Sequence, residues 1–268
     1  MIICVDVGNS GAKIGLVDGN VVLERARAAT SDVSQDALSE GLNTLIGGGS
    51  ERPTSIIAVS VVDRWLERLE HSADELQLPL TIVAASNVPI PTALVRPDLT
   101  GADRLLAAWA ASTIYGKPAI VVDLGTATTV DAVDADGFFL GGTIMPGLGL
   151  AATSLAEGTA RLPEVELDLP DDPIGGDTVS AIQNGLIVGH VGAIREIATR
   201  MRGRIGADAR IVITGGHTAA PWAQAAFFEE AGPDLPAVAD VIDPDLVMKG
   251  LSLLARQTAA PSPQSAGA

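Results

Sequence analysis

The sequence predicts an α/β protein built from two domains of related topology. Segments with the pattern of strands alternate with segments with the pattern of helices along the chain, as in α/β proteins. One hairpin also occurs twice, as VDVGNSGAKIGLVDGN at residues 5–20 and as VDLGTATTVDAVDADG at residues 122–137. With 268 residues, 47% of them apolar, the chain is long enough for two such domains.

The first domain is expected to span residues 1–115. IICVDV is dense in β-branched residues, and GNSG followed by AKIGLV gives a turn and a return strand that ends at an Asp-Gly-Asn turn. Helical spacing over residues 31–45 precedes a buried strand in TSIIAVSVV, a helix in DRWLERLEHSADELQ and a strand in LTIVAAS. Pro89, Pro91 and Pro97 hold the next segment extended. A helix then begins near Gly101.

The second domain is expected to span residues 116–257, after a Gly-Lys-Pro break. The second hairpin lies in AIVVDLGTATTVDAVDADGFFLGGTIM, where Gly141 and Gly142 predict a tight bend and Pro146 with Gly147 leads into a helix. Helical patterns cover DTVSAIQNGLIVGHVGAIREIATRM and DPDLVMKGLSLLARQ, with a strand, RIVITGG, between them. Residues 258–268 lack apolar periodicity and are predicted to be a disordered tail.

Composition excludes several classes of function. The net charge of −16 opposes a nucleic-acid surface, which needs clustered Lys and Arg. No apolar run approaches the roughly 18 residues of a membrane span, and the N-terminus has no basic segment before its first strand. We therefore expect a cytoplasmic protein that binds neither nucleic acid nor membrane. His71, His190 and His217 show no metal-ligand spacing and are interpreted as surface or core residues.

The repeated hairpin has the chemistry of a phosphate site. A glycine in the turn lets the backbone approach a phosphate, and Asn, Ser or Thr beside it donates hydrogen bonds to phosphate oxygens. An aspartate ahead of each turn, Asp6 or Asp123, can hold a bridging metal ion. The alternative is that both are ordinary hairpin turns. Two copies in matching strand context, with a later VITGG, favour two turns that face each other across a nucleotide cleft.

The motifs and their order resemble a known family. Duplicated phosphate hairpins with a later glycine turn resemble the superfamily of actin, sugar kinases, acetate kinase and heat-shock chaperone ATPases. Within it the chain is similar to type III pantothenate kinases from Ile2 to about Leu254. The motifs that carry this resemblance are, in order, DVGNSGAKIGL, GADR, VDLGTATTVD, GGTIMPGL, GTARLPEVEL, GGDTVSAIQNG, VITGG and DPDLVMKGL.

This resemblance implies transfer of the γ-phosphoryl group of ATP to the primary hydroxyl of pantothenate, the first step towards coenzyme A. It implies two actin-like, ribonuclease H-like domains that face a nucleotide cleft. It also implies a homodimer that binds pantothenate near its interface, Mg²⁺ and a monovalent cation, either K⁺ or NH₄⁺. The apolar helix from Leu105 to Ala111, beside the substrate loop, is the surface we expect such a dimer to bury.

The resemblance also assigns residues to roles. Thr126 is implied as a second phosphate contact, Asp123 as the monovalent-cation ligand and Thr178 as a further substrate contact. Asp103 is implied as the proton acceptor, and Asp6 is a candidate ligand for Mg²⁺. The implied first ATP loop consists of Asp6, Val7, Gly8, Asn9, Ser10, Gly11, Ala12 and Lys13, and the implied pantothenate loop of Gly101, Ala102, Asp103 and Arg104.

The chemistry of these residues leaves alternatives open. Asp103, in the first turn of a predicted helix, is expected to be a weak base because the helix dipole favours its carboxylate form. This suffices where the attacking hydroxyl loses its proton late, although a capping aspartate would look the same. Arg104 pairs with the pantothenate carboxylate or lies solvated on the helix. Lys13 reaches a phosphate oxygen or faces solvent.

The chain departs from the family pattern ahead of GADR. Type III pantothenate kinases carry Y-x-N-P there, whereas this chain has Leu94 and Arg96 at the Tyr and Asn positions. The pantoyl side of the acceptor site therefore lacks an aromatic wall and an amide. Two other functions remain open: a small-molecule kinase with a shifted acceptor, and a nucleotide-binding regulatory or accessory protein without turnover. The three carboxylates of Asp6, Asp103 and Asp123 favour an enzyme.

Overall fold

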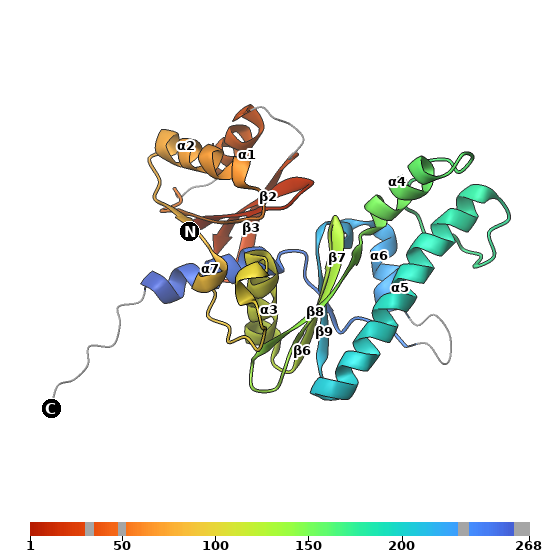
Figure 1. Ribbon diagram of the computed structural model, residues 1–268. Coiled ribbons are helices and arrows are strands. Elements are labelled where there is room, and N and C mark those ends of the chain that lie inside the picture. The colour runs from red at the N-terminus through yellow and green to blue at the C-terminus, as the bar shows by residue number, and fades with distance from the viewer. Residues whose placement is uncertain (30–34, 48–51, 230–235, 260–268) are drawn as a thin grey trace. The chain divides into compact units, whose positions relative to one another are not determined.

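The computed structural model describes residues 1–29, 35–47, 52–229 and 236–259 (Figure 1). The chain divides into two compact units. The first unit comprises residues 1–89, 96–110 and 245–268, and the second comprises residues 90–95 and 111–244. Each unit contains one five-stranded mixed sheet, which confirms the predicted two-domain α/β class.

The sheet of the first unit has the strand order β3-β2-β1-β4-β5. β1 (Ile2–Val7), β2 (Gly11–Asp18) and β3 (Val21–Ala29) form an antiparallel meander. β4 (Ile56–Ser60) lies parallel to β1, and β5 (Leu80–Ile82) lies parallel to β4. The central strand β1 is thus antiparallel to its hairpin partner and parallel to the strand that returns after a helix, as expected for βαβ connections.

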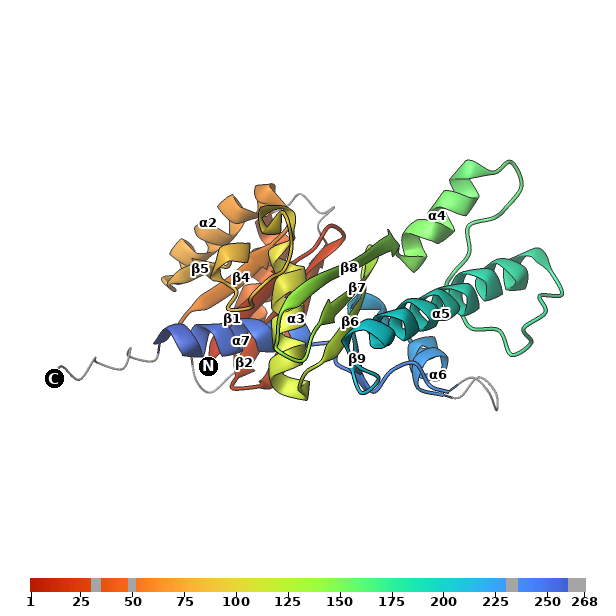
Figure 2. The same cartoon turned by 60° about the horizontal axis from the view of Figure 1, so that its bottom comes forward.

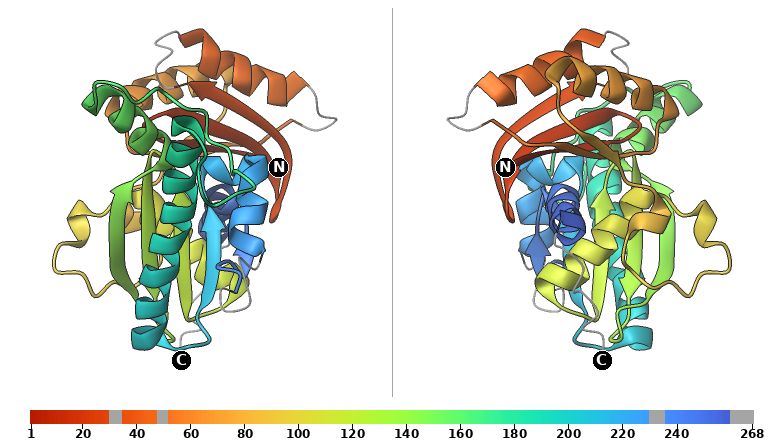
Figure 3. Two further views of the ribbon diagram at one scale, coloured as in Figure 1. Left: turned by 90° about the vertical axis from the view of Figure 1, so that its right-hand side faces the viewer. Right: turned by 90° about the vertical axis from the view of Figure 1, so that its left-hand side faces the viewer.

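Helices cover both faces of this first sheet (Figures 1 and 3). α1 (Gln35–Gly47) contacts the face on which Ile14 lies, because a Cβ at Gly41 would meet the Ile14 Cδ1 atom, and α2 (Leu66–Leu76) packs beside α1. α7 (Leu246–Ala259) contacts the opposite face, where a Cβ at Gly15 would meet the Met248 sulfur. Short 3₁₀ turns complete the unit at Asp63–Trp65, Ala85–Asn87 and Pro97–Leu99.

The position of α7 differs from the expected division of the chain, which placed residues 246–257 in the second domain. Arg25 of β3 binds Asp245 through two hydrogen bonds, and the Ser252 hydroxyl donates to the Gly19 carbonyl at 2.7 Å. Gly250 of α7 packs against Leu106 and Ala110 of α3 (Ala102–Tyr115). These contacts assign α7 to the first unit, because its apolar residues have their partners there.

The apolar stretch of α3 is buried within this single chain. All residues from Leu105 to Ala111 are less than 9% exposed, and Leu106 and Ala110 contact Gly250. The prediction that this stretch is the buried surface of a dimer is therefore wrong, because these side chains are already covered within one chain.

The sheet of the second unit repeats the topology of the first, with the order β10-β9-β6-β7-β8. β6 (Ala119–Leu124), β7 (Ala127–Val133) and β8 (Phe139–Pro146) form the antiparallel meander. β9 (Arg210–Thr214) is parallel to β6, and β10 (Val241–Ile242) is parallel to β9. β6 therefore corresponds to β1, and the repeated hairpin of the sequence is repeated as a whole sheet.

The helices of the second unit pack on one face of its sheet (Figures 2 and 3). They are α4 (Leu148–Gly158), α5 (Thr178–Ile205) and α6 (Pro221–Phe228), with a 3₁₀ turn at Gly216–Ala219. Their apolar residues form one core with alternate residues of the central strands, including Ile120, Val122, Leu124 and Val130. Asp123 and Asp131, at the intervening positions, lie on the other face.

Some elements differ from the prediction in detail. β3 and α6 were not predicted, the helix expected at 63–77 is split into a 3₁₀ turn and α2, and the bend expected at Gly141 is a β-bulge in β8. Residues 31–34 of the first predicted helix and residues 260–268 of the predicted tail lie outside the described part of the chain. Within that part, no helix is both long and apolar enough to cross a membrane.

Candidate active site

The first hairpin closes a three-residue turn at the end of β1. The amide of Gly8 donates to the carbonyl of Gly11 at 3.0 Å, and Asn9 and Ser10 between them are exposed. Val7 and Ala12, on either side, are buried in the core and support the turn rather than face a ligand. The exposed turn thus offers backbone amides and two polar side chains to a phosphate.

Asp6 and Lys13 are paired residues of β1 and β2, with Oδ2 and Nζ 4.0 Å apart. Val5 and Val7 point into the core under α1, so Asp6 points to the face covered by α7. Its side chain is 15% exposed and that of Lys13 is 23% exposed. Burial raises the pKa of Asp6 to about 6; Lys13 lowers this pKa, and the negative charge of Asp103 raises it.

Asp103 therefore belongs to the same group of charges as Asp6. It is the second residue of α3, and its Oδ1 accepts a hydrogen bond from the Arg104 amide at 2.9 Å. The carboxylate folds back over Gly101, where a Cβ would collide with Oδ1. Burial raises the pKa of Asp103 and outweighs the opposing effects of the Arg104 amide and charge. The expectation of a weak base is thus reversed, since desolvation opposes the helix-end effect.

The second hairpin turns at Gly125 and Thr126, at the end of β6. The Gly125 amide donates to the Ala127 carbonyl at 3.2 Å, and the Gly147 amide donates to the Thr126 carbonyl at 3.0 Å. Gly147 is the N-cap of α4, and a Cβ there would lie within 2.5 Å of the Thr126 oxygen. The start of α4 therefore presses against this turn, while the Thr126 side chain is exposed.

The glycine turn after β9 lies against the same hairpin. Gly215 has a φ of 106°, and a Cβ there would lie 2.5 Å from Asp123 Oδ1. Thr214 pairs with Asp123 in the parallel register of β9 and β6. The Thr214 hydroxyl is buried and, within the described residues, has no hydrogen-bond partner. The strand next to Asp123 thus carries a buried hydroxyl, that of Thr214, without a hydrogen-bond partner among the described residues.

A carboxylate and a hydroxyl on neighbouring strands are oxygen atoms of the kind that bind cations. A weakly hydrated monovalent cation accepts a carboxylate, a hydroxyl and backbone carbonyls without a strict geometry, and a buried hydroxyl without a partner is unfavourable unless something binds it. Among the described residues, no group of three or more His, Cys, Asp or Glu side chains could hold a metal ion. Asp123 and Thr214 are candidate cation ligands, because they are paired residues and the Thr214 hydroxyl is buried without a partner among the described residues.

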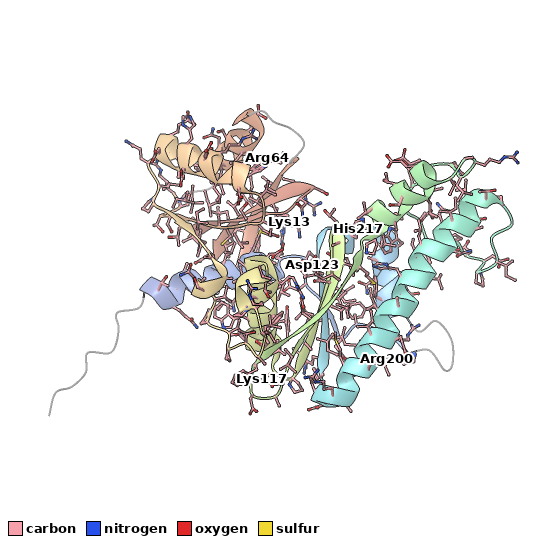
Figure 4. The ribbon with its side chains drawn as sticks, in the orientation of Figure 1. Lys13, Arg64, Lys117, Asp123, Arg200 and His217 are labelled. Atoms are coloured by element: carbon pink, nitrogen blue, oxygen red, sulfur yellow. The ribbon has the colours of Figure 1, made fainter. Side chains whose placement is uncertain are left out.

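Two histidines predicted to be surface or core residues also contact this hairpin. His190 of α5 places Nε2 2.9 Å from the Thr128 hydroxyl, and His217 places Nδ1 3.1 Å from the Leu124 carbonyl. Figure 4 shows Asp123 and His217 near the start of α4, whereas Lys117 lies at the other end of the second sheet. No sequence spacing links these pairs, because 62 and 93 residues separate their members.

Thr178 is not part of this cluster. It is the first residue of α5, it is exposed, and Asp177 caps the helix by accepting hydrogen bonds from the Val179 and Ser180 amides at 2.8 and 3.0 Å. Twelve residues separate Thr178 from His190 on one helix, which corresponds to about 18 Å along the axis. The second unit therefore brings together Asp123, Thr126 and its glycine turns, but leaves Thr178 remote from them.

Comparisons with known proteins identify a family. The family model of type III pantothenate kinase matches residues 2–200. A type III pantothenate kinase of Agathobacter rectalis is 33% identical over 264 residues, which cover 96% of this chain and 97% of that protein.

Two solved structures share the fold. A putative Baf family transcriptional activator from Campylobacter jejuni has a TM-score of 0.59 at 18% identity and covers 96% of this chain and 98% of its own. The activator of the 2-hydroxyisocaproyl-CoA dehydratase from Clostridium difficile, with bound ADPNP, has a TM-score of 0.51 at 13% identity, with 98% and 99% covered. At these identities the likeness extends to the fold alone.

Proposed function

This chain belongs to the type III pantothenate kinase family, and we propose that its two hairpins bind the phosphates of ATP while Asp103 serves the transfer to pantothenate. The supporting observation is the repeated sheet. In each unit the central strand, β1 or β6, ends in an exposed glycine turn that follows an aspartate. Such turns bind phosphate oxygens through backbone amides.

The reaction is a phosphoryl transfer from ATP to a primary alcohol. The hydroxyl oxygen of pantothenate forms a bond to the γ-phosphorus, the bond from that phosphorus to the bridging oxygen breaks, and ADP leaves with that electron pair. The hydroxyl proton passes to Asp103. The raised pKa of this carboxyl makes it a better acceptor than an ordinary surface aspartate.

The metal ions are assigned to the two aspartates that precede the turns. Asp6 would hold Mg²⁺, which neutralises charge on the β- and γ-phosphates when bound. Asp123 and Thr214 would hold K⁺ or NH₄⁺. Lys13 would meet a phosphate oxygen, because it shares a face with Asp6 and its ammonium is only partly exposed.

The acceptor side is assigned to Gly101–Arg104. We assign the pantothenate carboxylate to Arg104, whose planar fork suits a carboxylate. Leu94, in place of the family's tyrosine, packs on β8, where a Cβ at Gly141 would lie 2.9 Å from Leu94 Cδ2. Arg104→Gln should raise the KM for pantothenate but not for pantetheine, an acceptor that lacks the carboxylate.

The deciding experiment is release of ADP by the purified protein with ATP, Mg²⁺ and pantothenate, with and without K⁺. Turnover that requires pantothenate supports the proposal, and Thr126→Val should raise the KM for ATP. Nucleotide binding without turnover would indicate a regulatory protein. Turnover only with a different alcohol would indicate a shifted acceptor.

A cytoplasmic homodimer is also proposed, on a surface other than α3. Ile174 and Val179, 80% and 43% exposed, lie beside Thr178 on the loop before α5 and on its first turn, and Val188, 49% exposed, lies further along the same helix. A second copy that covers them would bring its Thr178 to an acceptor site, which fits the remoteness of Thr178 from the hairpin of its own chain. The cytoplasm is where the substrate ATP is available.

Light scattering and a mixing experiment test the dimer. Asp103→Asn and Thr178→Val should each be slow alone. When they are mixed in equal amounts, about half of the dimers are mixed and one of the two sites in each has both native residues, so about a quarter of the wild-type activity should return. A fully active monomer, or no gain on mixing after subunit exchange, would contradict this arrangement.

A further inference from the structure

We propose that His190 and His217 are positioning residues, which hold the second hairpin in the conformation that binds the phosphates of ATP. The inference rests on the proposed function of that hairpin. It adds two residues of the second unit, one on α5 and one in the 3₁₀ turn after β9. Each acts through a polar atom within two residues of the Gly125–Thr126 turn.

His190 reaches the hairpin from behind the sheet. Thr128 is 1% exposed and points to the face covered by α5, where Nε2 of His190 meets its hydroxyl at 2.9 Å. This bond joins the start of β7 to α5, a 28-residue helix whose apolar residues pack in the core. Without the imidazole, the Thr128 hydroxyl would be buried without this partner, which is unfavourable.

His217 holds the other strand of the hairpin. A carbonyl only accepts hydrogen bonds, so Nδ1 of His217 carries the proton in its 3.1 Å bond to Leu124. Nε2 then faces the start of α4, 4.0 Å from the Cβ position of Gly149. The Trp222 ring lies beside the imidazole, with centroids 6.3 Å apart. The bond to Leu124 and the neighbouring Trp222 ring therefore restrict the orientation of the imidazole.

The surroundings of His190 favour its neutral form. Burial, and then the neighbouring charge of His217, lower the pKa of His190. Nε2 of a neutral His190 ring makes one hydrogen bond with the Thr128 hydroxyl, as donor or acceptor according to its tautomer, and the ring places no positive charge behind the phosphate turn. The role is thus geometric: the two bonds fix Leu124 and Thr128, and Thr126 between them is held in place.

The experiment compares paired variants. His190→Leu and His217→Leu remove the bonds, whereas His190→Gln and His217→Asn place an amide nitrogen near the position of the lost ring nitrogen. Each Leu variant should raise the KM for ATP about 5- to 10-fold, as expected for one hydrogen bond. The KM for pantothenate should stay unchanged, and the amide variants should recover most of the affinity. His71→Leu is the matched control, because His71 pairs with Glu75 on the surface of the first unit.

A double variant keeps the test valid if a single variant folds poorly. His190→Leu with Thr128→Val removes both partners of the bond, so no buried hydroxyl is left unpaired. This protein should be as stable as the wild type by urea unfolding and should still bind ATP about 5- to 10-fold more weakly. A merely structural role would change its stability and leave the KM for ATP as it was.

Failure of the positioning role and failure of the proposed function give different results. If Thr126→Val changes the KM for ATP but the stable double variant and the His217 variants do not, the positioning role is wrong and the proposed function stands. If Thr126→Val also has no effect, the hairpin does not bind ATP and the proposed site itself is wrong.

Discussion

Asp6 and Lys13 face each other across β1 and β2, 4.0 Å apart, on the same face that Asp103 approaches. One ammonium is thus placed among two partly buried carboxylates. The raised pKa of Asp6 shows that Lys13 does not compensate for burial. Burial of these charges opposes folding, because it disfavours the ionised form of a carboxyl group.

The first prediction concerns stability against pH. Because the folded-state pKa of Asp6 is about 6 and its unfolded value is about 3.9, the folded protein binds more protons between these values. The contribution of Asp6 to stability is therefore most favourable below pH 4 and is lost as the pH rises through 6. Asp6→Asn should remove this loss and raise the free energy of unfolding at pH 8 by at most about 3 kcal/mol.

Urea unfolding at pH 5 and pH 8 measures this effect, and the same variant should lose kinase activity. Asp63→Asn, at an exposed 3₁₀ turn of the same unit, is the control and should change neither property. A less stable Asp6→Asn protein at pH 8 would show that Asp6 is a structural residue.

The second prediction concerns Asp103. Asp103→Asn keeps the shape but removes the proton acceptor, so kcat should fall by about 10² to 10⁴ while the Kd for ATP is unchanged. In the wild type, the acid limb of kcat should lie above the ordinary aspartate pKa, because burial raises the pKa of Asp103. Steady-state rates between pH 4 and 8, with calorimetric titration of ATP, separate the two effects. If the variant has the kcat of the wild type, Asp103 is not the proton acceptor and only caps α3.

The third prediction concerns the monovalent cation. Thr214→Val removes a buried hydroxyl without a partner in the described structure, so without ligands the variant should be more stable by about 1 kcal/mol. Its activation by K⁺ should nevertheless be lost, and Asp123→Ala should be slow and insensitive to K⁺. Rates in K⁺ and Na⁺ at fixed ionic strength measure both. Equal rates of the wild type in the two salts would exclude the site.

The fourth prediction concerns the contact between α4 and the second hairpin. Gly147→Ala places a Cβ against the Gly125 and Thr126 carbonyls, so it should raise the KM for ATP and lower the free energy of unfolding by about 1–3 kcal/mol. Gly185→Ala is the control: within 4 Å of its Cβ position there is no other described atom. That change should stabilise α5 by about 0.5–1 kcal/mol without affecting ATP. Unchanged ATP kinetics in Gly147→Ala would show that the hairpin tolerates displacement.

The central strands and their turns were predictable, because the Asp and Gly positions and β-branched runs are local signals. β3 was not predicted, although its residues alternate in burial, because Glu24, Arg25 and Arg27 make it look like a polar segment. α6 was not predicted either, since its apolar residues, PWAQAAFF, show little amphipathic spacing.

The site was predictable only where motifs are contiguous. Asp6, Asp103 and Asp123 stand beside glycine turns in the sequence, whereas the bond of His190 to Thr128 depends on how α5 packs. The direction of the Asp103 pKa shift also required the structure. A position in the first turn predicts a lowered pKa, and burial, which no local pattern reports, raises it.

The three-part composition of the first unit determines the order in which the chain can complete its folds during synthesis. The second unit has all its segments once residue 244 has left the ribosome, but the first sheet lacks α7 until residues 245–259 follow. Until then the face that bears Gly15 and its strand neighbour Cys4 lacks α7, whose Met248 lies against Gly15. The unit that contains the first residues to be synthesised is thus the last to be completed. Because the Cys4 thiol is buried in the completed fold, the loss of its reactivity would report when α7 has docked.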